Sequence, residues 1–184
     1  MTTDERYVKA EDGKKLFTRE WIPDNAPAAV LLIVHGMGEH SGRYHEFASF
    51  LAQQQVAVYS YDHRGHGLTD PDQKGHIDKD DGFTAMVLDL KMMHLKLNRQ
   101  FSDLPIFILG HSMGSFITMN YLQSQEDAPV PAGIIYSGTS GAVSALLPFG
   151  VMFSGLLKKV VGDRHRSEFM RNMVFKPYNN AFKP

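Results

Sequence analysis

The sequence predicts an α/β protein in which a mostly parallel sheet carries helices on both faces. Short apolar runs of strand length alternate along the chain with segments whose apolar residues recur at helical spacing, which is the pattern of a sheet built with crossover helices. One of the short runs, Ala28 to Val34, is apolar throughout. A strand of that kind is typical of the interior of a parallel sheet, where both faces are buried.

The first elements of the chain are expected to be two modest strands joined as a hairpin. Tyr7 to Ala10 and Leu16 to Trp21 are separated by Asp12-Gly13, a dipeptide that favours a tight turn between antiparallel strands. The buried strand of residues 28–34 follows them.

A helix and a further strand are expected after the buried strand. From Arg43 to Gln55 the apolar side chains recur at helical spacing, and Val56 to Tyr61 has the composition of a short strand. Pro71 to Asp81 is polar and contains glycine, so we expect a loop there. The apolar positions of the helix are Tyr44, Phe47, Phe50 and Leu51.

The next segment has the pattern of a long helix with one apolar face. It is followed by a strand from Pro105 to Leu109, a glycine-rich turn, a helix from Phe116 to Leu122 and a short strand from Gly133 to Tyr136. Residues 1–138 are therefore expected to form one α/β core with six strands. The apolar face of the long helix is formed by Phe83, Met86, Val87, Leu90, Met93, Leu97 and Phe101.

The composition excludes several classes of protein. Lys and Arg number 19 against 20 Asp and Glu, which gives a net charge of −1 over 184 residues, so a polyanion or nucleic-acid partner is not expected. Cysteine is absent, which excludes disulfides, thiolate metal sites and a cysteine nucleophile. The N-terminal residues lack the pattern of a signal peptide, and we expect a cytoplasmic protein.

The motif with the clearest chemistry is G-x-S-x-G at residues 110–114, between a predicted strand and a predicted helix. A sharp turn of this kind lifts the serine hydroxyl above the end of the sheet and places it at a helix N-terminus. Ser112 is therefore the candidate nucleophile. The alternative is that Ser112 merely caps the helix.

A second glycine-rich loop, His35-Gly36-Met37-Gly38, directly follows the buried strand. A loop at this position can direct a backbone N–H at an oxyanion, and two such donors are normally required. We expect the backbone N–H groups of Met37 and of Met113, the residue after the nucleophile, to form this oxyanion hole. The alternative is a phosphate-binding loop, but the longer G-x-G-x-x-G pattern is absent.

Together these motifs resemble the α/β-hydrolase fold. The stretch H-G-x-G-E-H-x-x-R-Y from His35 and the stretch Asp62-His63-Arg64-Gly65-His66-Gly67 are similar to the monoacylglycerol lipase and lysophospholipase branch of that fold. The resemblance implies a serine hydrolase that acts on a lipid-like carboxylic ester, with no cofactor. It also implies that residues 139–184 begin a helical cap or lid over the site.

The cap segment is apolar but interrupted. Ala142 to Val161 contains Pro148, two glycines and the pair Lys158-Lys159, whereas a membrane-spanning helix needs about 20 uninterrupted apolar residues. We expect one or two short helices that shape an acyl pocket and touch a membrane or lipid interface only transiently.

The acid and base of a catalytic triad follow the serine in α/β-hydrolases. His165 is the only histidine after Ser112, and Asp163 is the only aspartate after Asp127. Both lie in a basic run that is expected to be solvated, and nothing in the sequence places Asp163 beside a base. We therefore expect 1–184 to be a C-terminally truncated hydrolase that lacks roughly 80–100 residues, enough for two βα units, with the acid and base beyond residue 184.

Two alternatives remain open from the sequence. The chain could be a general carboxylesterase or thioesterase, or it could be a catalytically silent domain that self-associates through an exposed edge of its last strand. His63 and His66 are interpreted as residues that hold a loop, and no metal site is expected because a third spaced ligand is missing. An aspartate-nucleophile hydrolase is disfavoured by Ser112.

Overall fold

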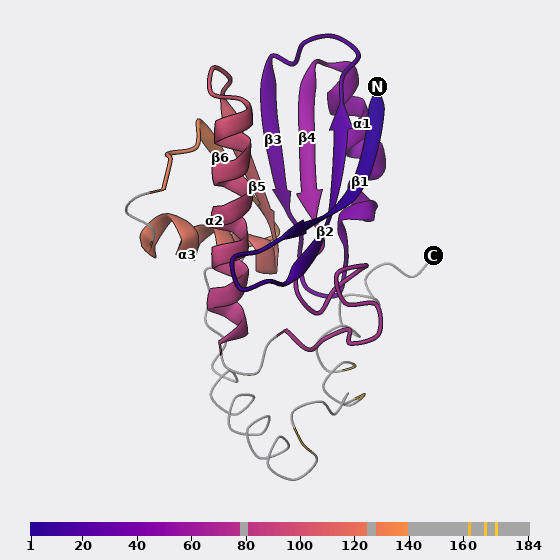
Figure 1. Ribbon diagram of the computed structural model, residues 1–184, viewed down its shortest axis with the longest axis vertical. Coiled ribbons are helices and arrows are strands. Elements are labelled where there is room, and N and C mark those ends of the chain that lie inside the picture. Colours follow the sequence, from indigo (N-terminus) through magenta and orange to yellow (C-terminus); the bar gives the residue numbers. More distant parts are fainter. Residues whose placement is uncertain (78–80, 125–127, 140–161, 163–167, 169–171, 173–184) are drawn as a thin grey trace. The chain divides into compact units, whose positions relative to one another are not determined.

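A computed structural model describes residues 1–77, 81–124 and 128–139 of the chain, and the single residues 162, 168 and 172. The chain divides into two compact units, Met1–Gly141 and Ala142–Pro184. All the elements discussed below belong to the first unit (Figure 1). The cap predicted for residues 139–184 lies almost entirely outside the described residues.

The first unit contains a six-stranded sheet with the order β1-β2-β4-β3-β5-β6. The two N-terminal strands pair with their neighbours in antiparallel fashion, and the other four are parallel to one another. The prediction of a six-stranded, mostly parallel sheet is confirmed. The strands are β1 (Thr2–Lys9), β2 (Lys15–Ile22), β3 (Ala29–Val34), β4 (Val56–Tyr61), β5 (Ile106–His111) and β6 (Gly133–Ser137).

Helices cover both faces of the sheet, as predicted. On one face α1 (His45–Gln53), preceded by a 3-10 turn over Ser41–Tyr44, packs through Ala48 and Ala52. On the other face α2 (Gly82–Gln100) and α3 (Met113–Ser124) form the larger core cluster. None of the helices in the described part of the chain is long and apolar enough to cross a membrane.

Strand β3 shows why a continuous apolar run is needed at the centre of the sheet. Its side chains alternate between the two core clusters, with Leu32 and Val34 on the side of α2 and α3 and Leu31 and Ile33 on the side of α1. All four are buried. The predicted burial of this strand on both faces is confirmed.

Two elements differ from their sequence predictions. Strand β1 begins at Thr2, because every residue from Thr2 to Lys9 pairs with β2, although its side chains are almost all exposed and carry no apolar pattern. In α1 the small residues Ala48 and Ala52 face the sheet, while Phe47 and Phe50 are 43% and 57% exposed. The helical spacing of the apolar residues therefore led to the right element, although its two phenylalanines do not belong to the core.

The long helix α2 follows its predicted pattern more closely. Five of the seven expected apolar positions are buried, and Phe101 at its C-terminal end packs partly against the core. Phe83, in its first turn, is 39% exposed. The five buried residues are Met86, Val87, Leu90, Met93 and Leu97.

Candidate active site

Ser112 is the single residue between strand β5 and helix α3. Its backbone φ is +50°, in the left-handed region, which costs an ordinary L-residue roughly 1–2 kcal/mol. The conformation is held from both sides, because the Ser112 N–H donates to the Ser137 carbonyl at 2.8 Å and the Ser112 carbonyl accepts from the Ser115 N–H at 3.0 Å. A strained, fully tethered turn of this kind is a mark of functional sites.

The two glycines of the motif are required by close backbone contacts. A Cβ on Gly110 would lie 2.7 Å from the Gly114 carbonyl oxygen, and a Cβ on Gly114 would overlap the Val34 carbonyl oxygen at the end of β3. The first turn of α3 therefore packs directly against the end of the central strand. Any larger residue at either position would push the serine turn away from the sheet.

The loop after β3 lies beside the serine. A Cβ on Gly36 would lie 3.1 Å from the Ser112 Cβ, and Met37, whose side chain is 52% exposed, comes next. Met113 is the first residue of α3 and packs partly against the core. Because β3 and β5 are parallel neighbours, the predicted nucleophile and the loop that carries the first predicted N–H donor meet at the same edge of the sheet.

His35 holds the peptide group that carries the Met37 N–H. Its Nε2 accepts from the His63 backbone N–H at 2.9 Å, so its proton is on Nδ1, which donates to the Gly36 carbonyl at 2.7 Å. That carbonyl and the Met37 N–H lie in one planar peptide group and point in opposite directions. Burial lowers the pKa of His35 to about 4, which keeps the ring in the neutral form that this arrangement needs.

Two further histidines lie under the same loop. His63 Nε2 donates to the His35 carbonyl at 3.0 Å, and His66 Nδ1 donates to the Arg64 carbonyl at 2.9 Å. Burial holds the pKa of His63 well below its usual value. These contacts agree with the prediction that His63 and His66 hold a loop, and no cluster of three or more metal-ligand side chains is found among the described residues.

Asp62 joins the loop after β4 to the segment that follows His35. Its buried carboxylate accepts from the Ser41 backbone N–H at 2.7 Å, from the Ser41 hydroxyl at 2.5 Å and from the Leu68 N–H at 2.7 Å. Farther along this loop, Arg64 makes a two-pronged ion pair with Asp89 of α2, at 2.7 and 2.8 Å. The loops around the site are thus tied to each other and to a core helix.

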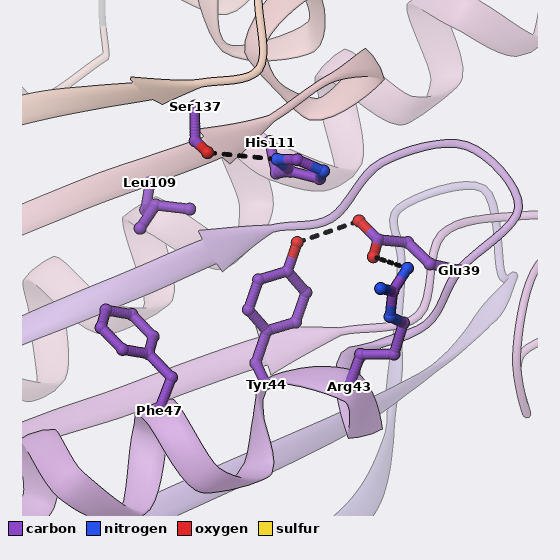
Figure 2. A pocket seen from close by; sticks show the side chains of 7 residues that line it. All are labelled: Glu39, Arg43, Tyr44, Phe47, Leu109, His111 and Ser137. Carbon is purple, nitrogen blue, oxygen red and sulfur yellow. Dashed lines mark hydrogen bonds and ion pairs between the residues drawn. The ribbon is translucent and has the colours of Figure 1, made fainter. Parts of the chain in front are cut away.

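A cavity of about 390 Å³ opens beside the serine turn. Figure 2 shows a polar end, where Glu39 lies between Tyr44 and Arg43, and an apolar side formed by Phe47 and Leu109. The lining is completed by His111, which precedes Ser112 in the chain, and by Ser137, whose carbonyl accepts from the Ser112 N–H. Glu39, Arg43 and Tyr44 belong to the motif that begins at His35, but their position in the sequence gave no indication that their side chains line a cavity.

Comparison with known proteins places these features in a family. The model of the hydrolase family described as serine aminopeptidase, S33, matches residues 25–174. Over 108 residues the chain is 38% identical to the monoglyceride lipase of Homo sapiens, which covers 59% of this chain and 34% of the lipase. It is 31% identical to the probable lysophospholipase L2 of Haemophilus influenzae over 66% of this chain and 39% of that protein.

A solved structure supports the same fold. The carboxyl esterase from Bacillus coagulans, crystallised with glycerol, superposes with a TM-score of 0.72 and 27% identity over 98% of this chain and 64% of the esterase. The matches to the two curated relatives span little more than a third of those proteins.

The positive φ at Ser112 should affect the free energy of unfolding of variants at this position. Glycine adopts positive φ without a Cβ clash, so Ser112→Gly should be more stable than Ser112→Ala by about 1 kcal/mol. Urea unfolding of both variants measures the difference. Gln55 also has a positive φ, of +62°, in a turn. The pair Gln55→Gly and Gln55→Ala should therefore show a stability difference of the same sign and serves as the matched comparison. Equal stability of the two Ser112 variants would show that the turn is not strained.

The buried histidines predict a pH dependence of stability. The unfolded chain binds a proton at His35 near pH 6.5, whereas the folded chain does so only near pH 4. The free energy of unfolding should therefore be greatest above pH 6.5 and fall toward pH 4, with a slope of about 1.4 kcal/mol per pH unit for each such histidine.

His63 contributes to this slope with the same sign, because burial also lowers its pKa. Urea unfolding at pH 7 and pH 5 should show a smaller difference for His63→Gln, whose amide can still donate to the His35 carbonyl, than for the unsubstituted protein. Replacement of the exposed His40 serves as the control. A slope unchanged in His63→Gln would contradict the assignment.

Proposed function

The chain belongs to the serine aminopeptidase S33 family of hydrolases, and on that premise we propose that it is a serine ester hydrolase with Ser112 as its nucleophile. The observation that carries the proposal is the left-handed turn at Ser112, set at the N-terminus of α3 and against the loop of Gly36. In α/β-hydrolases a serine on such a strand–turn–helix junction is the nucleophile, and the backbone N–H of the next residue contributes to the oxyanion hole.

The proposed reaction has two steps. The Ser112 hydroxyl oxygen bonds to the ester carbonyl carbon and gives its proton to a base, while the Met37 and Met113 N–H groups stabilise the oxyanion. The intermediate collapses to an acyl-enzyme as the alcohol leaves with a proton. In the second step water gives a proton to the base and attacks the acyl carbon. The bond to the Ser112 oxygen then breaks, Ser112 takes back a proton from the base, and the acid leaves.

The base is proposed to lie outside the described residues. In the described part of the chain no hydrogen bond joins a histidine to the Ser112 hydroxyl. The ring-nitrogen hydrogen bonds of three buried histidines go to backbone groups and not to Ser112. These histidines are His35, His63 and His66. His111 Nδ1 faces the Ser137 hydroxyl at 3.2 Å. The acid that would orient the base is placed outside these residues with it.

The proposed substrate is a lipid-like carboxylic ester of the monoacylglycerol or lysophospholipid type. The names of the two relatives support this class. A general carboxylesterase or thioesterase is the alternative, which the similarity to a carboxyl esterase favours. The proposed contact of the cap with a lipid interface depends on residues outside the described ones.

Labelling with a fluorophosphonate probe tests the nucleophile. The intact native protein should be labelled at Ser112, and Ser112→Ala should not be, because only an activated serine reacts with the probe. Ser115→Ala, which removes a neighbouring hydroxyl in the same turn, should still be labelled. Equal labelling of the native protein and Ser112→Ala would refute the assignment.

A second proposal concerns β6, which is the last strand of the described sheet. Ile135 and Tyr136 of this strand are 48% and 39% exposed, and β6 carries no charged residue. The opposite edge, β1, carries several charges, which discourage strand pairing. We propose that the chain self-associates through the β6 edge.

Sedimentation of the 184-residue chain tests this edge. The chain should sediment as a dimer or larger species, and Ile135→Lys should return it to a monomer because a lysine blocks pairing at an edge strand. Phe50→Lys, on the exposed side of α1, is the control and should leave the association unchanged. A monomeric 184-residue chain would contradict the proposal.

A further inference from the structure

We propose that Glu39 is a positioning residue that holds the oxyanion-binding loop in the conformation needed for catalysis. The proposal rests on the proposed function, because it assumes that the Met37 N–H stabilises the oxyanion. Its evidence is a connected set of contacts that runs from Arg43 and Tyr44 through Glu39 and Gly36 to Ser112.

The Glu39 carboxylate has three donors. Oε1 accepts from the Gly36 backbone N–H at 2.5 Å and from the Tyr44 hydroxyl at 2.9 Å, and Oε2 accepts from Arg43 at 3.0 Å. Glu39 itself is only 8% exposed. Figure 2 shows the carboxylate between Tyr44 and Arg43 at the polar end of the cavity. A buried carboxylate paired in this way is fixed in position.

The contact with Gly36 determines the direction of the next N–H. The Gly36 N–H belongs to the peptide group before its Cα, and the Gly36 carbonyl belongs to the peptide group after it. Glu39 holds the first group and His35 holds the second. With both planes held, φ and ψ of Gly36 are fixed and so is the orientation of the Met37 N–H. Glycine needs such restraint because its backbone is the most flexible.

Gly36 also allows Glu39 and Ser112 to approach each other closely. A Cβ at this position would lie 2.9 Å from Glu39 Oε1, 3.1 Å from Ser112 Cβ and 3.2 Å from the His111 ring. No side chain fits between the carboxylate and the nucleophile. A shift of the carboxylate would therefore be transmitted through Gly36 to the reacting centre.

The charge of Glu39 must be balanced, because a bare carboxylate near a developing oxyanion would oppose catalysis. Arg43 supplies the balancing charge, although its side chain is 66% exposed. Tyr44 supplies a hydroxyl that stays protonated, since burial and the neighbouring Glu39 charge raise its pKa well above the usual value. Both donors lie in the 3-10 turn that directly precedes α1, which connects the loop to a packed helix.

Steady-state hydrolysis of a soluble p-nitrophenyl ester by the native protein tests the proposal. Glu39→Ala should lower kcat about 10- to 100-fold and leave KM within about twofold, because a misdirected oxyanion donor is felt in the transition state only. Glu39→Gln retains an oxygen acceptor for the Gly36 N–H and should restore kcat to within about fivefold. Glu20→Ala removes another buried, ion-paired carboxylate and should leave kcat unchanged.

Hydrogen exchange of the Gly36 amide provides a readout that does not depend on turnover. Exchange should be faster in Glu39→Ala than in the native protein and close to native in Glu39→Gln. If Glu39→Ala does not fold, Tyr44→Phe replaces it, because this change removes only the hydroxyl that orients Glu39. It should lower kcat about threefold with no change in KM.

The outcomes separate the two proposals. If the native protein shows no ester hydrolysis that depends on Ser112, the proposed function is contradicted, and this inference with it. Native turnover with an unchanged kcat in Glu39→Ala, or in Tyr44→Phe where the first does not fold, would overturn the positioning role alone. Slow Gly36 exchange in Glu39→Ala would overturn it as well.

Discussion

The close approach of Gly114 to the Val34 carbonyl is the constraint on which the rest of the site depends. A residue with a side chain at position 114 would overlap that oxygen, so the first turn of α3 can reach the end of β3 only through glycine. This approach brings the Ser112 turn against the loop of Gly36. Without it, the serine and the predicted N–H donor of Met37 would belong to separate parts of the sheet edge.

Around that contact the loops are tied together by buried polar groups. Asp62 binds the backbone of both adjoining loops, His35 and Glu39 hold the two sides of Gly36, and Arg64 connects the loop after β4 to α2. Buried backbone groups must find partners. The histidines supply some of these partners as neutral rings, because burial lowers the pKa of His35 and of His63.

The fold was predictable wherever a residue's burial follows its polarity. The apolar run of β3 and the periodic face of α2 led to the right elements for that reason. The prediction was incomplete at β1, which is a strand because of its pairing with β2 and not because of its side chains. The helical spacing that includes Phe47 and Phe50 predicted α1 correctly, but the buried contact with the sheet is made by Ala48 and Ala52, which a search for large apolar residues passes over.

The sequence by itself determined the order of the elements, the candidate nucleophile and the loop expected to face it, because a strand, a tight turn and a helix leave their pattern in neighbouring residues. Only the tertiary structure decided which side chains restrain that loop. The proton position on His35 depends on the backbone of His63, 28 residues away, and Glu39 is oriented by two side chains of the 3-10 turn before α1. Hydrogen bonds of this kind depend on where the folded chain places each donor, and residue order does not record that.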